Sequence, residues 1–460
     1  MRTLRPPKTT VDAEAIPSAV KDLCGRLASR GHGSWIVGGC VRDHLLGRAV
    51  NDWDLCTTAR PRELLEVFPR AVPTGIDHGT LTVVVDRVPY EVTTLRGEGT
   101  YTDGRRPDRV YFLDDVTQDL ARRDFTVNAI AYDPLGGVLV DPFGGRQDLE
   151  DGVLRAVGDP FTRFSEDGLR ILRGARFVAT LGFELDPATE AAMERALPVF
   201  RKVSAERVRD EWCKTFKAPQ PSRAFEVMRR RGILAVTCPP LLEAVGCAQG
   251  DGRAYDVWTH TMRAVDACPK DTVLRTAAVF HDVGKARTRA VDPATGAVTF
   301  PSHELVGASL ADQWLQDYRY SNDERQRVVH LIRHHRVGYQ PSWSDGAVRR
   351  YVRAVGLEAL KDLAALWAAD ARARGPDPDP DLAVQRALLE RVEAVLERGR
   401  VLGPRDLAVD GTALMKDLGL KPSKQLGELL AQLLERAMDD PSVNTREGLL
   451  ALARERLAAG

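Results

Sequence analysis

A glycine-rich turn followed closely by two acidic residues is the feature that most constrains this chain. The apolar run 35–37 predicts a short strand, and Gly38 and Gly39 follow it directly. Glycines allow a backbone to turn sharply and to approach a ligand closely. The stretch 41–46 predicts a helix, so the turn also presents free amide groups at a helix start. This order of strand, turn and helix predicts an α/β domain whose turn is compatible with phosphate.

The two acidic residues, Asp52 and Asp54, are two positions apart. On a strand, that spacing puts both side chains on one face. Two hard oxygen ligands on one face make a Mg²⁺ site of the kind that enzymes use to move phosphoryl groups. Arg42, between the turn and the acids, offers a planar cation suited to phosphate oxygens. Each fragment alone is usually structural, but their combination and order favour a functional site.

Four motifs in a fixed order extend this pattern along the chain. They are Gly38-Gly39 with Arg42-Asp43, Asp52-x-Asp54, Arg-Arg-Asp-Phe-Thr-Val-Asn-Ala at 122–129, and Glu-Asp-Gly-Leu-Arg at 166–170. On these motifs the chain resembles the class II (bacterial) tRNA nucleotidyltransferases, which are the CCA-adding enzymes of the poly(A) polymerase superfamily. The resemblance implies an α/β N-terminal nucleotidyltransferase domain with a palm-like fold, followed by all-α neck, HD and tail domains.

The sequence pattern changes where these domains are expected to meet. Up to about residue 157, β-rich runs alternate with turns, whereas the chain from 161 onward reads as successive helices. The predicted strands include 81–85, 90–95, 110–112 and 129–132. We expect a catalytic head at 1–158, a helical neck with the nucleotide-template and RNA-binding region at 159–235, an HD metal-binding domain at 236–400 and a helical tail at 401–460.

By this resemblance, three acids form the catalytic site: Asp52, Asp54 and Glu91. Together they are expected to hold Mg²⁺, which polarises the α-phosphate and lowers the pKa of the primer 3′-hydroxyl. Glu91 lies in the predicted strand 90–95, and the structural alternative for it is an exposed strand residue. Gly39 and Arg42 are expected to bind the nucleotide.

The resemblance also assigns nucleotide contacts further along the chain. Arg123 is expected to contact the nucleotide phosphates, with Asp124 and Asn128 ordering the pocket around it. Asp167 and Arg170 are expected to act as a protein template that reads the Watson–Crick edge of the base, accepting C or A and rejecting G and U. A surface ion pair at i and i+3 is the structural alternative for these two residues.

Two arginines extend this pattern toward the RNA. Arg173 and Arg176 continue the same three-residue spacing on a predicted helix and are expected to lean toward the triphosphate or the RNA. The segment 203–211, in which Ser204 is placed to cap a helix, resembles a family segment that buttresses the template helix.

The implied activity is template-independent addition of C and A to the 3′ end of tRNA from CTP and ATP, with release of pyrophosphate. A poly(A) polymerase, or a split-function enzyme that adds only CC or only A, is the alternative within the same class. The segment 98–108 predicts a mobile loop, and a loop at this place assists the switch from C to A in the resembling enzymes. A metal-dependent phosphohydrolase acting on RNA ends is the alternative from a different class.

A second group of residues predicts another metal site. His260, the adjacent pair His281-Asp282 and the distant Asp370 match the pattern of the HD domain, which binds a divalent metal from several helices. Imidazole and carboxylate ligands suit Mn²⁺, Ni²⁺, Zn²⁺ or Fe. His303, with either His334 or His335, could complete a second metal position. Hydrogen-bonded core histidines are the structural alternative.

The overall composition restricts the partners and the compartment. Lys plus Arg and Asp plus Glu number 65 each, so RNA binding must depend on local patches such as Arg163 and Arg170 rather than on net charge. The seven cysteines include no Cys-x-x-Cys pair, which fits reduced thiols. No signal-peptide pattern and no apolar run near the ~18 residues of a membrane helix is present. We expect a cytoplasmic protein that binds tRNA, CTP and ATP and no membrane.

Overall fold

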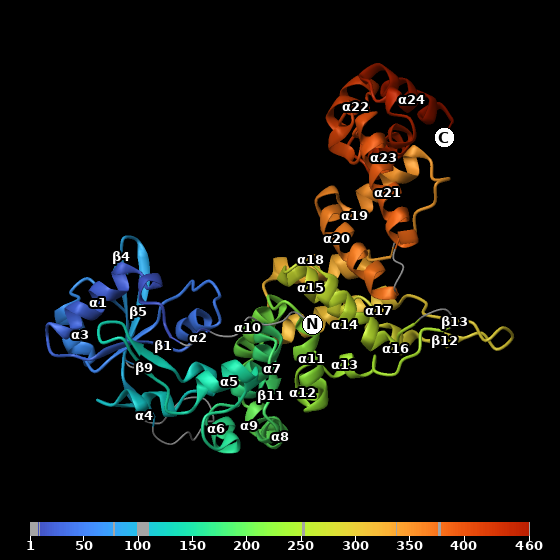
Figure 1. Cartoon of the computed structure of the whole chain (residues 1–460). Helices are drawn as coiled ribbons and strands as arrows, with labels where there is room; N and C mark the ends of the chain where they lie inside the picture. Colours follow the sequence, from blue (N-terminus) through green and yellow to red (C-terminus); the bar gives the residue numbers. More distant parts are fainter. Residues whose placement is uncertain are drawn as a thin grey trace. The chain divides into compact units, whose positions relative to one another are not determined.

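The chain divides into two compact units, Met1–Pro239 and Pro240–Gly460 (Figure 1). The structure is a computed structural model, and it describes residues 8, 10–76, 79–98, 110–250, 254–336, 338–375 and 379–459. The expected domain boundaries at 158/159, 235/236 and 400/401 remain predictions.

A mixed sheet of seven strands forms the centre of the first unit, in the order β3-β4-β5-β2-β1-β8-β9. The bounds of these strands in chain order are β1 Ser34–Val37, β2 Leu55–Thr57, β3 Val72–Gly75, β4 Thr80–Val85, β5 Val88–Thr94, β8 Ala131–Asp133 and β9 Val138–Val140. Strand β2 runs parallel to β5 and antiparallel to β1. This sheet confirms the predicted α/β class of the N-terminal region.

The hairpin between β4 and β5 shows how the local sequence sets this topology. The strands pair in register up to Val85 and Val88, so only Asp86 and Arg87 form the turn. Both turn residues have positive φ angles, 51° and 67°, as a tight hairpin between right-twisted strands requires. A separate pair, β6 (Arg96–Glu98) and β7 (Val110–Phe112), follows. The predicted loop 98–108 lies, apart from Glu98, outside the described residues.

Helices surround the sheet and then replace strands almost completely, as predicted from residue 161 onward. Beyond the sheet, α7 packs against α10 and α11, and most of its residues are buried. The helices of the first unit are α1 Ser18–Ala28, α2 Gly39–Leu45, α3 Pro61–Val67, α4 Val116–Ala121, α5 Gly145–Asp151, α6 Pro160–Glu166, α7 Leu169–Leu181, α8 Pro187–Arg195, α9 Leu197–Phe200, α10 Ala205–Phe216, α11 Pro221–Arg230 and α12 Ile233–Thr237.

The second unit is helical apart from the short strands β12 (Ala290–Val291) and β13 (Val298–Thr299). Its helices are α14 Val257–Ala267, α15 Thr272–Phe280, α16 Lys285–Thr288, α17 His303–Asp317, α18 Asn322–Arg333, α19 Asp345–Val355, α20 Leu357–Arg374, α21 Asp379–Glu397, α22 Gly411–Leu418, α23 Lys424–Asp439 and α24 Arg446–Ala459, after α13 (Pro239–Leu242) at the unit boundary.

The last helices bury their apolar faces in a core of their own. The leucines of the tail that the sequence pattern assigned to an apolar stripe all take part, either buried or packed against the core: Leu414, Leu418, Leu420, Leu426, Leu429, Leu430 and Leu433. Among the helices of the described part of the chain, none combines the length and the apolar character needed to cross a membrane.

Candidate functional site

The glycine turn at the end of β1 brings a distant arginine close to the backbone. Gly38 has a φ of 79°, and a Cβ atom built on it would lie 2.7 Å from the Nη1 atom of Arg123. Only glycine tolerates both the conformation and this contact. The amide of Gly38 donates to the carbonyl of Ile130 at 3.0 Å. Helix α2 then begins at Gly39, two residues before its predicted start.

The prediction that Asp52 and Asp54 lie on a strand is wrong, because β2 begins only at Leu55. Its antiparallel partner β1 ends at Val37, where the chain turns away at the glycines, so residues before Asp54 have no strand to pair with. Asp54 is the last residue held by the ladder: its carbonyl accepts from the amide of Val37 at 3.0 Å. Asp52 and Asp54 are both exposed residues, although the surrounding protein shields part of the Asp54 carboxylate from water.

The parallel pairing of β2 and β5 places Asp54 beside Glu91. Leu55 pairs with Val92, so the residue before each of them occupies the neighbouring position. Partial removal from water, followed by the negative charges of Glu91 and Asp52, raises the pKa of Asp54 to about 6, while Arg123 lowers it. The three acids are therefore near enough to repel one another.

Arg42 and Arg123 are both held by protein acids near this turn. The Nε and Nη2 atoms of Arg42 donate to the two carboxylate oxygens of Asp43 at 3.0 and 2.8 Å. Its Nη1 donates to the side-chain oxygen of Asn128. Arg123 donates to Asp119 at 3.3 Å, and its buried Nε has no hydrogen-bond partner among the residues that the structure describes.

Asp167 and Arg170 do not pair with each other, and the predicted single helical stripe is broken between them. Helix α6 ends at Glu166, Asp167 is extended with a φ of −141°, and α7 begins at Leu169. Gly168, between Asp167 and α7, has helical φ and ψ angles and passes close to another segment, since a Cβ atom there would lie 2.7 Å from the backbone of Phe200. The break between the two helices is therefore at Asp167.

Each member of this predicted template pair has another partner. Asp167 accepts two hydrogen bonds from Arg207, at 3.1 and 2.7 Å. Arg170 is buried, with Nη1 donating to the Glu166 carboxylate at 2.6 Å and Nη2 to the carbonyl of Arg122 at 3.0 Å. The surface ion pair proposed as the structural alternative is therefore wrong for these two residues.

Arg173 and Arg176 belong to a buried ion-pair network. Arg173 donates to Asp124 at 2.8 Å, and Arg176 donates to Glu211 at 2.6 Å. Burial opposes ionisation of these acids, but Arg173 and the Asn128 amide hold the pKa of Asp124 well below its usual range. In the same way, Arg176 and Arg173 outweigh burial and lower the pKa of Glu211. Their contact with nucleotide or RNA remains a prediction.

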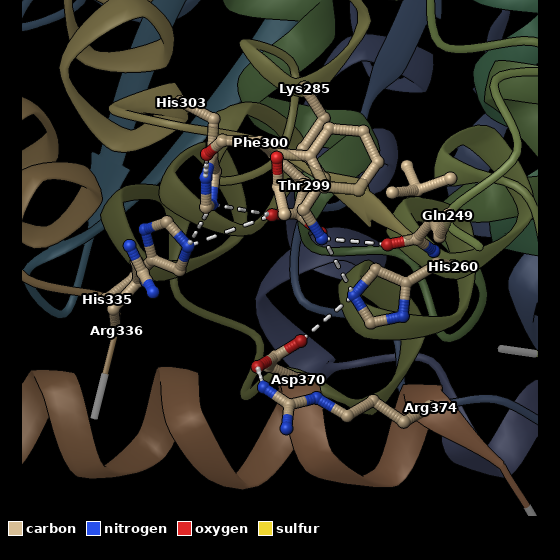
Figure 2. A pocket seen from close by; sticks show the side chains of 12 residues that line it. Gln249, His260, Lys285, Thr299, Phe300, His303, His335, Arg336, Asp370 and Arg374 are labelled. Carbon is tan, nitrogen blue, oxygen red and sulfur yellow. Dashed lines mark hydrogen bonds and ion pairs between the residues drawn. The ribbon is translucent and has the colours of Figure 1, made fainter. Parts of the chain in front are cut away.

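The histidines and aspartates of the second unit converge in a pocket of about 530 Å³ (Figure 2). His260, His281 and Asp370 form one group in which all ligand atoms lie within 4.8 Å of one another. The His260 Nε2 atom lies 2.9 Å from the Asp370 carboxylate. These residues come from α14, the end of α15 and α20, so distant parts of the sequence build the group.

A second group of the same size consists of Asp282, His303 and His335. Asp282 joins the two groups: one oxygen lies 3.3 Å from His281 Nε2, and the other lies 3.4 Å from His303 Nε2. Of the two candidates, His335 takes part, whereas His334 stacks on His330 with ring centroids 4.5 Å apart. The structure thus gathers all four predicted HD residues and selects His335.

Backbone carbonyls orient these imidazoles. The Nδ1 atoms of His281, His303 and His335 lie 2.7 to 2.8 Å from the carbonyl oxygens of the residues three positions earlier. A proton on Nδ1 leaves the Nε2 lone pair directed at the centre of each group, which is the usual arrangement of a metal-binding histidine. Burial opposes the protonated form of His281, but the charges of Asp282 and Asp370 outweigh burial and raise the pKa of His281 to about 10. A metal that binds His281 must therefore displace a proton.

The sequence patterns did not indicate Asp119. It pairs with Arg122 and Arg123, and its spacing of three and four residues on a helix could have revealed it. Arg207 and Glu211 belong to the segment 203–211 that was expected to buttress the template helix, but no local spacing indicates their individual partners, which are 40 and 35 residues away.

A mixed sheet carrying adjacent acids beside a glycine turn, followed by a helical region rich in arginine, defines a nucleotidyltransferase of the poly(A) polymerase class. Residues 34–155 match the family described as the poly A polymerase head domain. Residues 182–244 match the probable RNA and SrmB-binding site of polymerase A, and residues 305–453 match the putative tRNA nucleotidyltransferase domain 2.

Two relatives of this chain are both described as CCA-adding enzymes. A CCA-adding enzyme of Streptococcus pyogenes is 32% identical over 437 residues, which cover 94% of this chain and 95% of the relative. One of Anoxybacillus flavithermus is 44% identical over 209 residues, or 45% of this chain and 52% of the relative. The chain belongs to the family of CCA-adding enzymes. This confirms the predicted tRNA nucleotidyltransferase activity, and such membership implies a divalent metal, generally Mg²⁺.

Solved structures agree with this assignment. The crystal structure of the Bacillus stearothermophilus CCA-adding enzyme in complex with CTP matches with a TM-score of 0.72 and 27% identity, covering 96% of this chain and 98% of that one. The Thermotoga maritima CCA-adding enzyme complexed with tRNA matches with a TM-score of 0.58 and 18% identity, covering 96% of each chain. The second likeness concerns the fold alone.

Proposed function

We propose that this enzyme completes the 3′ end of tRNA with C and A from CTP and ATP, using Asp52, Asp54 and Glu91 as its catalytic acids. The observation that carries the proposal is the parallel register of β2 and β5, which sets Asp54 beside Glu91. Relatives described as bound to CTP, to ATP and to tRNA support the same three partners.

The acids fit a divalent cation. The pKa of Asp54 is raised because its carboxylate is partly removed from water and lies near two like charges. A cation would relieve that repulsion. Carboxylate oxygens are the ligands that Mg²⁺ prefers. When bound by Asp52, Asp54 and Glu91, Mg²⁺ supplies neutralisation of the triphosphate charge and favours the ionised 3′-hydroxyl.

Positively charged side chains of this protein would bind the phosphates during transfer. The 3′-oxygen forms a bond to the α-phosphorus and loses its proton, while the bond from the α-phosphorus to the bridging oxygen breaks and pyrophosphate leaves. Arg123 lies near the acids and keeps its buried Nε without a partner among the described residues, so it can donate to the departing charge. Arg42 and Gly39 are proposed to border the same phosphates.

Base choice is proposed to depend on Asp167 and Arg170. A carboxylate accepts from the exocyclic amine that C and A share, and a guanidinium donates to their unprotonated ring nitrogen. U and G present a carbonyl and a protonated ring nitrogen at these places, so both contacts turn unfavourable. Arg173 and Arg176 are proposed to support this pocket through Asp124 and Glu211.

Purified protein incubated with tRNA that lacks its last three nucleotides tests this proposal. C followed by A, in order and from CTP and ATP together, is the expected product. Only CC, only A, or long A tracts would instead identify a split-function enzyme or a polymerase. Asp52→Ala and Asp54→Ala should abolish incorporation, and persistent incorporation in either variant would remove these acids from the site.

A second candidate function belongs to the histidine–aspartate pocket, which we propose binds divalent ions of the Mn²⁺, Ni²⁺, Zn²⁺ or Fe type. The specific observation is the sharing of Asp282 between two groups of three ligands. Lys285, Arg336 and Arg374 line the same pocket and provide positive charge for an anion. Hydrolysis of phosphoesters at RNA ends, including cyclic phosphates and 2′-phosphates, is the activity that such a site suits.

A measurement of bound metal distinguishes a metal site from a group of histidines that only belong to the core. We expect protein loaded with Mn²⁺ and then dialysed to retain metal, and Asp282→Ala to lose it. His334→Ala is the matched control, since His334 stands outside both groups and should leave the metal content unchanged. Equal metal content in the parent and in Asp282→Ala would refute the assignment. Opening of a 2′,3′-cyclic nucleotide by water, to a 2′- or 3′-phosphomonoester with a free neighbouring hydroxyl, would then establish hydrolysis.

We also propose the cytoplasm as the working compartment. Cys24, Cys40, Cys56 and Cys268 are buried thiols, and burial raises the pKa of each, to about 11 for Cys24 and Cys40. Thiols kept protonated in this way are inert and suit a reducing environment.

A further inference from the structure

One wall of the histidine–aspartate pocket is formed by the chain at the end of β13. Val298, Thr299 and Phe300 line the pocket there, shortly before α17 begins at His303 (Figure 2). Phe300 carries the one phenyl ring among the described residues that line this pocket, and it is half-buried. A partly open ring in a pocket with many charged side chains offers a flat apolar surface to a ligand.

A strained turn ties Phe300 to one of the histidines of the pocket. Ser302, between Phe300 and the end of the turn, has a φ of 54°, which residues other than glycine rarely adopt. The turn sets the carbonyl oxygen of Phe300 2.8 Å from the Nδ1 atom of His303. The two rings approach edge to face, with centroids 6.5 Å apart. The position of Phe300 is therefore coupled to the group of Asp282, His303 and His335.

The phenyl ring also lies beside a cation. Lys285 Nζ is 5.4 Å from the centre of the Phe300 ring. The same ammonium donates to Asp282 at 2.6 Å and to the Gln249 side-chain oxygen at 2.7 Å. Gln249 is anchored in turn, because its amide nitrogen donates to the carbonyl of Tyr255 at 3.2 Å. A fixed positive charge and an aromatic surface thus lie next to each other in one pocket.

A ligand that uses both features carries an anionic group and a flat ring. A nucleotide has both, since its phosphate accepts hydrogen bonds from ammonium and guanidinium groups and its base has two π faces. Stacking of a base on an aromatic side chain tolerates every base, because it does not depend on the hydrogen-bonding edge. A phosphoester without a base would use the cations alone.

We propose that Phe300 is the surface on which the base of a nucleoside 2′-phosphate stacks in this pocket. The phosphate is directed toward Lys285 and the two groups of metal ligands, and purine and pyrimidine nucleotides are both accepted. This inference rests on the proposed hydrolysis of phosphoesters by the histidine–aspartate pocket. It makes Phe300 the residue that distinguishes nucleotides from simpler phosphoesters.

The first test compares two esters in the full-length protein loaded with Mn²⁺. The ratio of kcat/KM for adenosine 2′-phosphate to that for glycerol 2-phosphate is measured in the parent, Phe300→Ala and Phe300→Trp. We expect Phe300→Ala to lower this ratio about tenfold, the order of one base stacked on an aromatic ring, and Phe300→Trp to keep it. Bound Mn²⁺ should stay constant in both variants. Val291→Ala is the control, since Val291 belongs to the same hairpin but is exposed and outside the pocket lining.

The second test detects stacking without turnover. Phe300→Trp adds one indole to the seven of the chain, and a stacked base quenches its fluorescence. With metal removed by a chelator, adenosine 2′-phosphate should quench this variant more than the parent, and glycerol 2-phosphate should not. A short RNA that ends in a 2′-phosphate is titrated in the same way. Extra quenching by only one of these two base-containing ligands identifies it as the source of the base, and extra quenching by neither contradicts the inference.

The remaining outcomes separate the ring from the pocket. An unchanged ratio in Phe300→Ala removes the ring from the ligand contacts. An equal loss for both esters, together with less bound Mn²⁺, would mean that Phe300 only supports His303. A parent that neither retains Mn²⁺ nor hydrolyses either ester defeats the proposed hydrolytic function itself, whereas a parent that hydrolyses both with a ratio unaffected by Phe300→Ala loses only the stacking role.

Discussion

Removal of the buried carboxylate of Glu211 should destabilise the first unit strongly. Glu211 is 2% exposed and contacts Arg176, Lys214 and, at 3.9 Å, Arg173. Glu211→Leu removes the carboxylate that pairs with the buried Arg176 guanidinium, which also lies over the ring of Phe177 at 4.0 Å. Breaking a buried pair in this way costs about 3–5 kcal/mol.

A second substitution shows whether that cost comes from an unpaired charge. Replacing a whole buried ion pair by apolar side chains is often nearly neutral. Methionine at position 176 can also pack against the ring of Phe177. We therefore expect the Glu211→Leu/Arg176→Met double variant to be more stable than the sum of the single changes by about 2 kcal/mol.

Urea unfolding of the full chain measures these free energies. Hydrogen exchange of peptides from α7 and α10 assigns the transition to the first unit, where loss of the pair should raise exchange in both helices. Glu194→Gln, at an exposed position of α8, is the matched control and should change stability by less than about 0.5 kcal/mol. Additive single changes would refute the reasoning, because no charge would then have been stranded.

Three further outcomes follow from the geometry. Glu91→Gln should lower the pKa of Asp54 below about 6, because a like charge is removed. In the parent, Mg²⁺ affinity falls as the pH drops through about 6 and Asp54 takes up a proton. In the variant, calorimetric titrations should show that the Mg²⁺ affinity persists to lower pH. Gly168→Ala forces a Cβ atom against the backbone of Phe200 and should cost about 1–3 kcal/mol in unfolding experiments and reduce C incorporation. Asp282→Asn should reduce bound Mn²⁺ at both groups, seen as loss of the spin-coupled Mn²⁺ signal in electron paramagnetic resonance.

Elements with a strong local signal could be predicted from the sequence. The predicted strands at 81–85 and 90–95 correspond to β4 and β5, although β5 begins two residues earlier than predicted, at Val88. The tail leucines at helical spacing lie in or against one core. In such segments local propensity and burial favour the same structure.

Predictions failed where tertiary contacts decided the outcome. Asp52 and Asp54 lie just before β2, which begins at Leu55, because the turn at Gly38 ends its antiparallel partner strand. The extended backbone of Asp167 separates α6 from α7, the helix of Arg170. Ser204 stands at the N-cap of α10 as predicted, yet its side chain makes no capping hydrogen bond. The partners Arg207 and Glu211 depended on helix packing, which spacing does not reveal.

The histidine–aspartate pocket could be predicted only in part from the sequence. The adjacent pair His281-Asp282 identified the centre from sequence, and the remaining ligands came from a resemblance rather than from spacing. The choice of His335 over His334 depended on which ring faces Asp282 at the end of α18, and adjacent residues there point in different directions. Only the folded chain could make that choice.

The pairing of Leu55 with Val92 lets two core residues set the spacing of the proposed catalytic acids Asp54 and Glu91. Both core residues are essentially inaccessible to water, and each follows its acid by one position. A slip of this pairing by one residue would drive Asp54 inward and expose Leu55, at once spoiling the core and dispersing the acids. Variants that loosen this apolar contact should therefore lose turnover while every polar side chain of the centre is still intact.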